Sequence, residues 1–293
     1  MKNIIIVTGG AGFVGSNLVQ RLLEYKKYKI ISIDDYSSGS KRNHIKSKKV
    51  NYIKGNTKHI EKYLKNKKNN IKTIFHFGEF SRIYQSFLNF NQCLNSNLIG
   101  TKAVINFCLK NKIKLIYSAT SASLGNKGND KNLSPYAYTK AKNLELLENM
   151  RKWFNFKFEI IYFYNVYGKN QITKGKMATI IGIFEKQFKN KKSLTVVKPG
   201  TQTRKFTHIE DTIDVCIEAW KKNKCKHYSI SSKKNYSIIE IAKFFGGRIK
   251  FLPKRKGERF ASALTRMHLS NNVINRVGKM SIKKYILNFK KNI

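Results

Sequence analysis

A tyrosine and a lysine near the middle of the chain have the spacing of an acid–base pair. Tyr136 and Lys140 occur in the run Ser-Pro-Tyr-Ala-Tyr-Thr-Lys, which ends at Lys140. Residues 135–153 are typical of a helix, and residues four apart lie on one face of a helix. An ammonium beside a phenol favours the phenolate, which would bring the pKa of Tyr136 toward the range of a general base. The hydroxyl of Thr120, at the end of a predicted strand, could bond the same substrate oxygen.

The Tyr-x-x-x-Lys spacing is weak evidence by itself, because this chain is rich in lysine. It also occurs at Tyr25 and Lys29, Tyr63 and Lys67, and Tyr138 and Lys142. For any single copy, a packing or surface role is the more common explanation. Only the copies that start at Tyr136 and Tyr138 follow a cluster of strand-end hydroxyls. We therefore predict Thr120, Tyr136 and Lys140 as catalytic residues and Tyr138 as a packing residue.

A glycine-rich turn near the start of the chain predicts a dinucleotide site. The sequence Val-Thr-Gly-Gly-Ala-Gly-Phe-Val-Gly follows the apolar run 4–6 and leads into a predicted helix. Such a turn lets the backbone approach a pyrophosphate, and the N–H groups of the helix start face the phosphates. The residues predicted to contact the cofactor here are Gly9, Gly12, Phe13, Val14 and Gly15.

An acidic residue follows at the expected distance. The strand-like run 29–33 ends in Asp34 and Asp35, about 20 residues past the glycines. The chain has only 16 acidic residues, so a chance pair at this place is improbable. A carboxylate that accepts from the adenosine 2′-hydroxyl would repel a 2′-phosphate, so Asp34 favours NAD over NADP.

The order of elements predicts an α/β fold. Strand candidates at 50–53, 73–78, 114–118 and 158–163 alternate with helix candidates at 97–111 and 135–153. This alternation indicates a Rossmann-type, doubly wound parallel sheet over residues 1–165. Residues 166–293 are predicted to form mainly a smaller substrate-binding lobe, with some segments returning to the first domain. Helices are expected there at 211–221 and at 237–245, the second with a capping box at Ser237 and Glu240.

Composition narrows the functional class further. No apolar run approaches the roughly 18 residues that cross a bilayer, and the apolar start is too short for a signal peptide. The four cysteines lack metal-site or disulfide spacing, so we expect reduced thiols, no bound metal and a cytoplasmic location.

The net charge of +43 comes from lysines spread along the whole chain, without a nucleic-acid-binding motif. We expect no specific nucleic-acid partner, and any binding should weaken with salt.

Taken together, the motifs resemble the extended short-chain dehydrogenase/reductase family, in particular NAD-dependent nucleotide-sugar epimerases and dehydratases and, among these, UDP-glucose 4-epimerase-type enzymes. The similarity runs nearly end to end. It covers 8–15, Asp34, 74–78, Asn97 with Gly100 and Thr101, Thr120, Pro135 and Tyr136 with Lys140, 162–168, and 203–208 with Asp211.

The resemblance implies a role for each matching residue. Thr120, Tyr136 and Lys140 match the catalytic triad, and Tyr136, Lys140 and Asn97 also match cofactor-binding positions. Asn165 matches a substrate-contacting asparagine, Arg204 and Arg255 match arginines that hold the nucleotide diphosphate, and Lys174 resembles a basic residue of heptose 6-epimerases. A homodimer through the helices near 97–111 and 135–153 is also implied.

The implied reaction is NAD-dependent epimerisation of a nucleotide sugar, at C4 of a UDP-hexose, through a transient 4-keto sugar. The alternatives are a 4-keto-sugar reductase, a 6-epimerase, and a non-enzymatic dinucleotide-sensing protein. Three departures bear on the choice. Ser121 and Ala122 stand where the family's dehydratases have Asp-Glu, Asn56 replaces a common adenine-binding aspartate, and Glu79 replaces an alanine beside the cofactor. The first disfavours dehydration.

Overall fold

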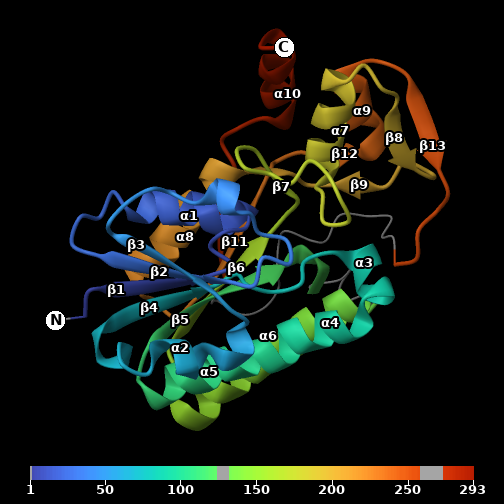
Figure 1. Ribbon diagram of the computed structural model, residues 1–293. Coiled ribbons are helices and arrows are strands. Elements are labelled where there is room, and N and C mark those ends of the chain that lie inside the picture. Colours follow the sequence, from blue (N-terminus) through green and yellow to red (C-terminus); the bar gives the residue numbers. More distant parts are fainter. Residues whose placement is uncertain (1, 124–131, 258–272) are drawn as a thin grey trace.

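The computed structural model describes residues 2–123, 132–257 and 273–293. Its centre is an eight-stranded sheet in which every pair of neighbouring strands is parallel (Figure 1). The spatial order is β14-β11-β6-β5-β4-β1-β2-β3. The strands are β1 (Ile4–Thr8), β2 (Lys29–Asp34), β3 (Val50–Lys54), β4 (Ile71–His76), β5 (Lys114–Thr120), β6 (Phe158–Phe163), β11 (His227–Ser231) and β14 (Val273–Val277).

Helices cover both faces of this sheet, so its central strands are apolar on both sides. All five residues of β1 are buried, and alternate residues enter different cores. Ile4 and Ile6 belong to one core, while Ile5 and Val7 belong to the other. The first core is covered by α2 (Ile60–Leu64), α5 (Thr101–Lys110) and α6 (Pro135–Phe154), and the second by α1 (Phe13–Leu22) and α8 (Ile209–Lys222).

These elements confirm the predicted doubly wound Rossmann-type fold. Helix α1 begins at Phe13, directly after the glycine turn, and β6 has the predicted bounds. The helix expected at 97–111 is divided into a π-helical segment, Asn95–Gly100, and α5. Two short helices precede it, α3 (Ile83–Leu88) and α4 (Phe90–Leu94).

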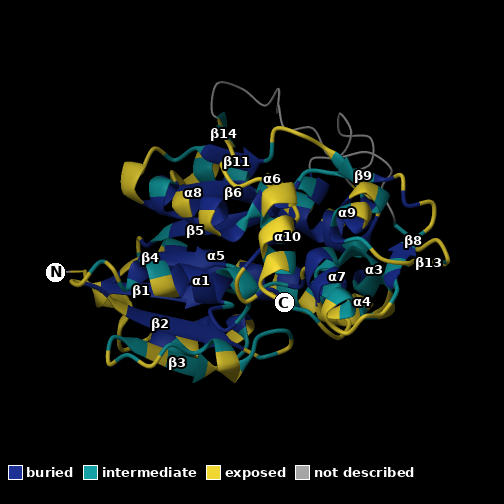
Figure 2. Cartoon of the chain, turned by 90° about the horizontal axis from the view of Figure 1, so that it is seen from above, coloured by how far each residue is buried: buried dark blue, intermediate teal, exposed yellow. Residues whose placement is uncertain are grey.

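The remaining elements form a smaller lobe with its own core (Figure 2). Helix α9 has the predicted capping box of Ser237 and Glu240 and ends at Gly246. The late strands β11 and β14 and helix α8, in contrast, belong to the large sheet. The lobe contains α7 (Ile180–Lys189), α9 (Ile238–Phe245), α10 (Ile282–Lys291), β8 (Leu194–Val197), β9 (Thr203–Arg204), β12 (Tyr236–Ser237) and β13 (Ile249–Leu252); β7 (Val166–Tyr167) and β10 (Thr207–His208) pair beside it.

The topology determines where a ligand can bind. The chain runs outward from β1 to β2 and β3, and then returns to β4 on the other side of β1. The carboxyl ends of β1 and β4 therefore border the crevice in which ligands of such sheets bind. Within the described residues, no helix is long and apolar enough to cross a membrane, and no three His, Cys, Asp or Glu side chains are grouped so that they could hold a metal ion. All four cysteines are free.

Candidate active site

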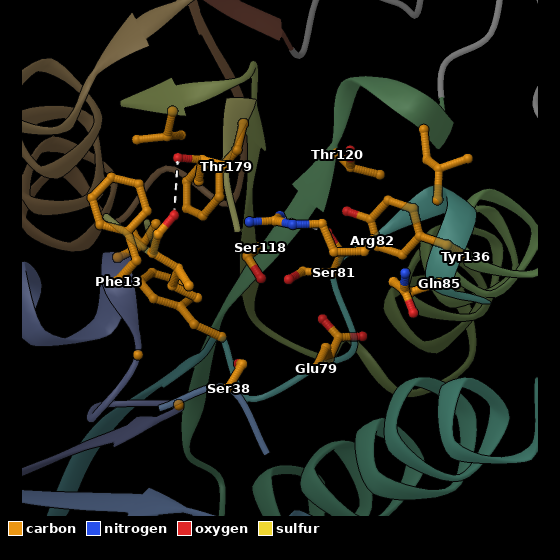
Figure 3. Close-up of a pocket in the computed structure, with 18 of the residues that line it drawn as sticks. Phe13, Ser38, Glu79, Ser81, Arg82, Gln85, Ser118, Thr120, Tyr136 and Thr179 are labelled. Atoms are coloured by element: carbon orange, nitrogen blue, oxygen red, sulfur yellow. Dashed lines mark hydrogen bonds between the residues drawn. The ribbon is translucent and has the colours of Figure 1, made fainter. Parts of the chain in front are cut away.

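A cavity of about 600 Å³ lies where the carboxyl ends of the strands meet the smaller lobe. Residues that follow β1, β2, β4, β5 and β6 form one wall, and residues of the lobe, including Thr179 and Arg204, form the other. Figure 3 shows side chains from both parts pointing into this space. The predicted site residues that line it are Gly9, Gly12, Phe13, Val14, Gly15, Asp34, Thr120, Tyr136, Lys140, Asn165, Arg204 and Arg255.

The glycine turn is packed so tightly that side chains could not be added without displacing backbone. Gly9 has φ +71°, and a Cβ there would lie 2.8 Å from the backbone nitrogen of Gly78. A Cβ on Gly15 would lie 2.1 Å from the carbonyl oxygen of Gly9. Gly12 is the N-cap of α1 and carries no side chain that could cover the first N–H groups of the helix. The arrangement fits a pyrophosphate held by backbone N–H groups.

Asp34 is held in place by the backbone at the end of β2. Its carboxylate accepts hydrogen bonds from the N–H of Ala11 at 2.9 Å and from the N–H of Tyr36 at 2.8 Å. Burial raises the pKa of Asp34 above its usual value, and these two hydrogen bonds act in the opposite direction. The carboxylate is thereby fixed at the edge of the cavity where an adenosine ribose is expected.

The local sequence explains how Tyr136 reaches the cavity. The Ser134 side chain accepts a hydrogen bond from the N–H of Ala137 at 3.1 Å, and Pro135 occupies the first turn of α6. Both residue types favour a helix start at this point, so Tyr136 lies in the first turn and Lys140 one turn later. Tyr136 is 8% exposed and lines the cavity, whereas Tyr138 is 39% exposed and lies outside the described lining.

The electrostatics of Tyr136 differ from the expectation based on spacing. Burial raises the pKa of Tyr136 to about 12, and the negative charge of Glu79 acts in the same direction. A hydrogen bond from Thr120 and the positive charge of Arg82 lower it. The expected lowered pKa is therefore not found in the protein alone, because burial of the phenol outweighs the favourable partners.

Lys140 is also arranged differently from the expectation. Its ammonium donates to the Glu79 carboxylate and, at 2.6 Å, to the backbone carbonyl of Ser118. It lies 4.8 Å from the centre of the Tyr117 ring. The lysine is 4% exposed, and the carboxylate with which it forms an ion pair, Glu79, is buried as well.

The far end of the cavity contains the residues expected to hold the substrate. Asn165, with φ 35°, donates from its side-chain amide to the carbonyl of Lys205 at 2.8 Å. Arg204 lies in β9, and the Arg255 guanidinium lies over the Tyr84 ring, 5.3 Å from its centre. Planar guanidinium groups suit paired hydrogen bonds to phosphate oxygens.

Two predicted residues are not brought to the cavity. Asn97, in the π-helical segment, lies outside the described lining of the cavity. Its side-chain oxygen accepts from the N–H of Phe80 at 2.7 Å, and its side-chain nitrogen donates to the carbonyl of Phe80 at 3.1 Å. The amide also donates to the Thr139 hydroxyl at 3.0 Å and contacts the Cys93 sulfur at 3.9 Å. Asn97 therefore holds the cavity wall rather than facing a ligand. Lys174 is exposed and lines a smaller, adjoining hollow that shares Gly175, Ala178 and Ile183 with the cavity.

Two charged residues that line the cavity had no role in the sequence-based prediction. Arg82 donates from Nε and Nη2 to the carbonyl of Met177, at 3.0 and 2.6 Å, so the lobe holds its guanidinium beside Tyr136 (Figure 3). Glu79 had been noted only as a departure from the family pattern. Both residues follow β4, at the carboxyl ends of the strands. Ligands of such sheets bind there, so this position in the sequence is the signal that could have identified them as site residues.

Comparison with known proteins identifies the family. The family model described as "NAD dependent epimerase/dehydratase family" matches residues 5–231. The chain belongs to this family. ADP-L-glycero-D-manno-heptose-6-epimerase of Brachyspira hyodysenteriae is 28% identical over 257 residues, which cover 82% of this chain and 79% of that protein.

Solved structures share the whole fold. UDP-glucose 4-epimerase of Thermotoga maritima has a TM-score of 0.84 and 21% identity, and the match covers 99% of both chains. UDP-glucuronic acid 4-epimerase of Bacillus cereus has a TM-score of 0.85 and 24% identity, over 99% of this chain and 100% of that one. The protein is thus an enzyme of an NAD-dependent family, and its glycine turn and Asp34 fit that cofactor.

Proposed function

We propose that this protein is an NAD-dependent nucleotide-sugar epimerase that inverts C4 of a UDP-linked hexose. The observation that carries the proposal is the composition of one cavity. The glycine turn and Asp34 lie on its dinucleotide side, Arg204 and Arg255 lie on the lobe side, and Thr120, Tyr136 and Lys140 lie in the same lining. A nucleotide sugar held by the arginines would thus place its sugar toward Tyr136.

The chain's own residues supply proton transfer and orientation. Bound NAD supplies a hydride acceptor that can return the hydride, which no side chain provides. Tyr136 would take the proton from the C4 hydroxyl and later give it back, while Thr120 bonds the same oxygen. Because burial keeps the phenol protonated, nearby cations are needed to form the phenolate. Lys140 and Arg82 are the cations at this place in the cavity.

The strand end after Thr120 favours epimerisation over dehydration. Ser121 and Ala122 form a short 3-10 turn that lines the cavity. Loss of a hydroxyl from the sugar requires an acid to protonate the leaving oxygen. Neither of these two residues can act as that acid, whereas the dehydratase pattern described above has Asp-Glu there.

A 6-epimerase is the second candidate, favoured by the similarity to the heptose 6-epimerase of Brachyspira hyodysenteriae. The residue that suggested it, Lys174, is exposed and lies outside the described lining of the cavity, in the hollow that adjoins it. The two structural neighbours named above are 4-epimerases. We therefore propose inversion at C4 as the first candidate reaction and inversion at C6 as the second.

The test is incubation of the purified protein with UDP-glucose, UDP-galactose, UDP-glucuronic acid and an ADP-heptose, with and without added NAD. We expect one C4 pair to interconvert to equilibrium without net cofactor reduction, and deuterium at C4 to be retained in the product. Inversion at C6 would support the second candidate. Consumption of NADH in a parallel incubation with a nucleotide-linked 4-keto sugar would identify a reductase. Either this result or inversion at C6 would contradict the C4 proposal.

A further inference from the structure

Glu79 places a carboxylate inside the catalytic corner of the cavity. Its side chain is 2% exposed, and one oxygen, Oε2, receives the Lys140 ammonium. The other oxygen, Oε1, accepts from the hydroxyl of Thr101 at 3.0 Å, the hydroxyl of Tyr117 at 3.1 Å and the amide of Asn143 at 3.2 Å. Four donors from three elements thus hold this carboxylate, which lines the cavity below Ser81 in Figure 3.

A buried chain of hydrogen bonds fixes the carboxylate further. The Thr101 hydroxyl gives its proton to Glu79, so it must accept from Nε2 of His76, which lies 2.9 Å away. Nδ1 of His76 then accepts from the Thr8 hydroxyl at 2.7 Å. Burial lowers the pKa of His76 to about 4, which keeps the ring neutral and the direction of the chain defined. Glu79 is therefore connected to the end of β1, where the glycine turn begins.

We propose that Glu79 is a positioning residue that fixes the Lys140 ammonium and withdraws its positive charge from Tyr136. The proposal rests on the role of Tyr136 as the base in the proposed function. An ammonium has three N–H groups, and Glu79 and the Ser118 carbonyl use two of them. Among the described residues, no third hydrogen-bond acceptor contacts Lys140, so one N–H remains for a ligand in the cavity.

The charges around this corner explain the consequence for Tyr136. The groups that face Glu79 are Lys140 and Tyr136 of α6, Tyr117 of β5, His76 of β4, and the Cys93 thiol of α4. With Lys140 neutralised by Glu79, Arg82 is the cation whose charge favours the Tyr136 phenolate. Figure 3 shows the hydroxyl end of Tyr136 turned toward Thr120 and the Arg82 side chain.

A second buried ion pair provides a matched control. Lys114 donates to Glu159 at 2.8 Å, and Glu159 also accepts from the N–H groups of Cys225 and Lys226. This pair lies at the amino ends of β5 and β6, whereas Tyr136 lies near the carboxyl ends of the strands. The pair is also outside the described lining of the cavity. Loss of the Glu159 charge should disturb packing without reaching Tyr136.

The experiment is an NMR titration of Tyr136 in protein labelled with carbon-13 at the tyrosine rings and supplied with NAD. The Tyr136 signal is assigned by its absence in Tyr136→Phe. In Glu79→Gln we expect the phenol to titrate at least about one pH unit lower than in the wild type, because a nearby negative charge is lost. In Arg82→Gln it should titrate higher. In Glu159→Gln it should not change.

An unchanged titration in Glu79→Gln, or equal shifts in Glu79→Gln and Glu159→Gln, would overturn the proposal. A shift to lower pH in both Glu79→Gln and Arg82→Gln would overturn it too, because it would indicate general loosening. If Glu79→Gln does not fold, Glu79→Ala replaces it, since it removes the same negative charge. The readout needs no turnover. If the Tyr136 titration shifts in Glu79→Gln but the wild type has no epimerase activity, only the proposed function is rejected. If the wild type is an active epimerase but the titration does not shift, only the role of Glu79 is rejected.

Discussion

The carboxylate of Asp34 accepts the backbone N–H of Ala11 at 2.9 Å, which connects the end of β2 to the glycine turn after β1. The acidic residue and the glycine turn are therefore held at a fixed separation by a direct contact. We expect a dinucleotide that binds the turn to present its ribose to this carboxylate.

Replacement of Asp34 tests cofactor choice. In Asp34→Ala, NAD affinity should fall by about 10- to 100-fold, because hydrogen bonds to a charged acceptor are lost. NADP affinity should fall less or rise, because the carboxylate no longer repels the 2′-phosphate. Calorimetric titration with both cofactors measures this. Asp35→Ala is the comparison variant, since Asp35 is the exposed neighbour in the same lining and accepts from the N–H of Ser37 instead of from the glycine turn. An unchanged preference in Asp34→Ala would contradict the assignment.

Replacement of Tyr136 tests the base. Tyr136→Phe should keep NAD binding and lose about 10²-fold or more in turnover, as expected when a positioned general base is removed. Tyr138→Phe should keep wild-type turnover, because Tyr138 is 39% exposed and outside the described cavity lining. Steady-state kinetics with the substrate identified in the panel measure both. The reverse pattern would show that the second of the overlapping motifs is the functional one.

Burial of Tyr136 predicts the direction of the pH dependence. Its pKa is raised to about 12, so the phenolate is a minor form at neutral pH and its fraction grows as pH rises. We expect kcat/KM, which reports groups of the free enzyme, to rise by up to about tenfold per pH unit through the neutral range. A rate that falls over this range would exclude the phenolate as the base.

The edge strand β14 is held by an ion pair that predicts acid sensitivity. Arg276 donates to Glu218 at 3.0 and 2.6 Å and, with Lys222, lowers the pKa of Glu218 from 4.5 to about 2. A lowered folded-state pKa adds stability above the unfolded value, and this stability is lost as pH falls toward 2.

The size of this effect is limited because Arg276 is 40% exposed. Glu218→Gln should lower the free energy of unfolding by at most about 1 kcal/mol at neutral pH, with a smaller difference from wild type in acid. Urea unfolding at both conditions measures it. An equal difference at both conditions would indicate a packing defect instead of the ion pair.

Exposed apolar side chains near α6 predict the oligomeric state. Ile99 in the π-helical segment is 53% exposed, and Leu88 and Phe90 before it are 60% and 50% exposed. We expect this surface to meet a second copy of the chain, since large apolar side chains gain stability when buried. Ile99→Glu should shift the protein from dimer to monomer in light scattering. Val277→Glu, on the edge strand β14, should not, although Val277 is 61% exposed. A monomeric wild type would contradict this prediction.

Local patterns predicted most of the fold because each carries its own physical cause. The glycine turn and Phe13 mark the start of α1, and Ser237 with Glu240 marks the start of α9. These features depend on hydrogen bonds within a few residues, so they can be recognised in a single sequence.

The parts that sequence reasoning missed depend on contacts between distant segments. Asn97 was placed at the cofactor, but its amide is used by Phe80 and Thr139. The pairing of Glu79 with Lys140 joins residues on different elements. Burial of the phenol, together with the negative charge of Glu79, raises the pKa of Tyr136 in the protein alone. Spacing along a helix correctly brought Tyr136 and Lys140 together but gave no information on which charge would neutralise the lysine.

The position of β11 has a consequence for how the chain acquires its structure during synthesis. β6 pairs with β5 on one side and with β11 on the other, and β11 is separated from it in sequence by 63 residues that include α7, β8 and α8. Until residues 227–231 have left the ribosome, β6 is an open edge strand made of Phe-Glu-Ile-Ile-Tyr-Phe. Open apolar edges pair with other chains. A nascent chain or fragment that stops at residue 165 should therefore aggregate, and completion of the nucleotide-binding sheet should wait for the chain's final third.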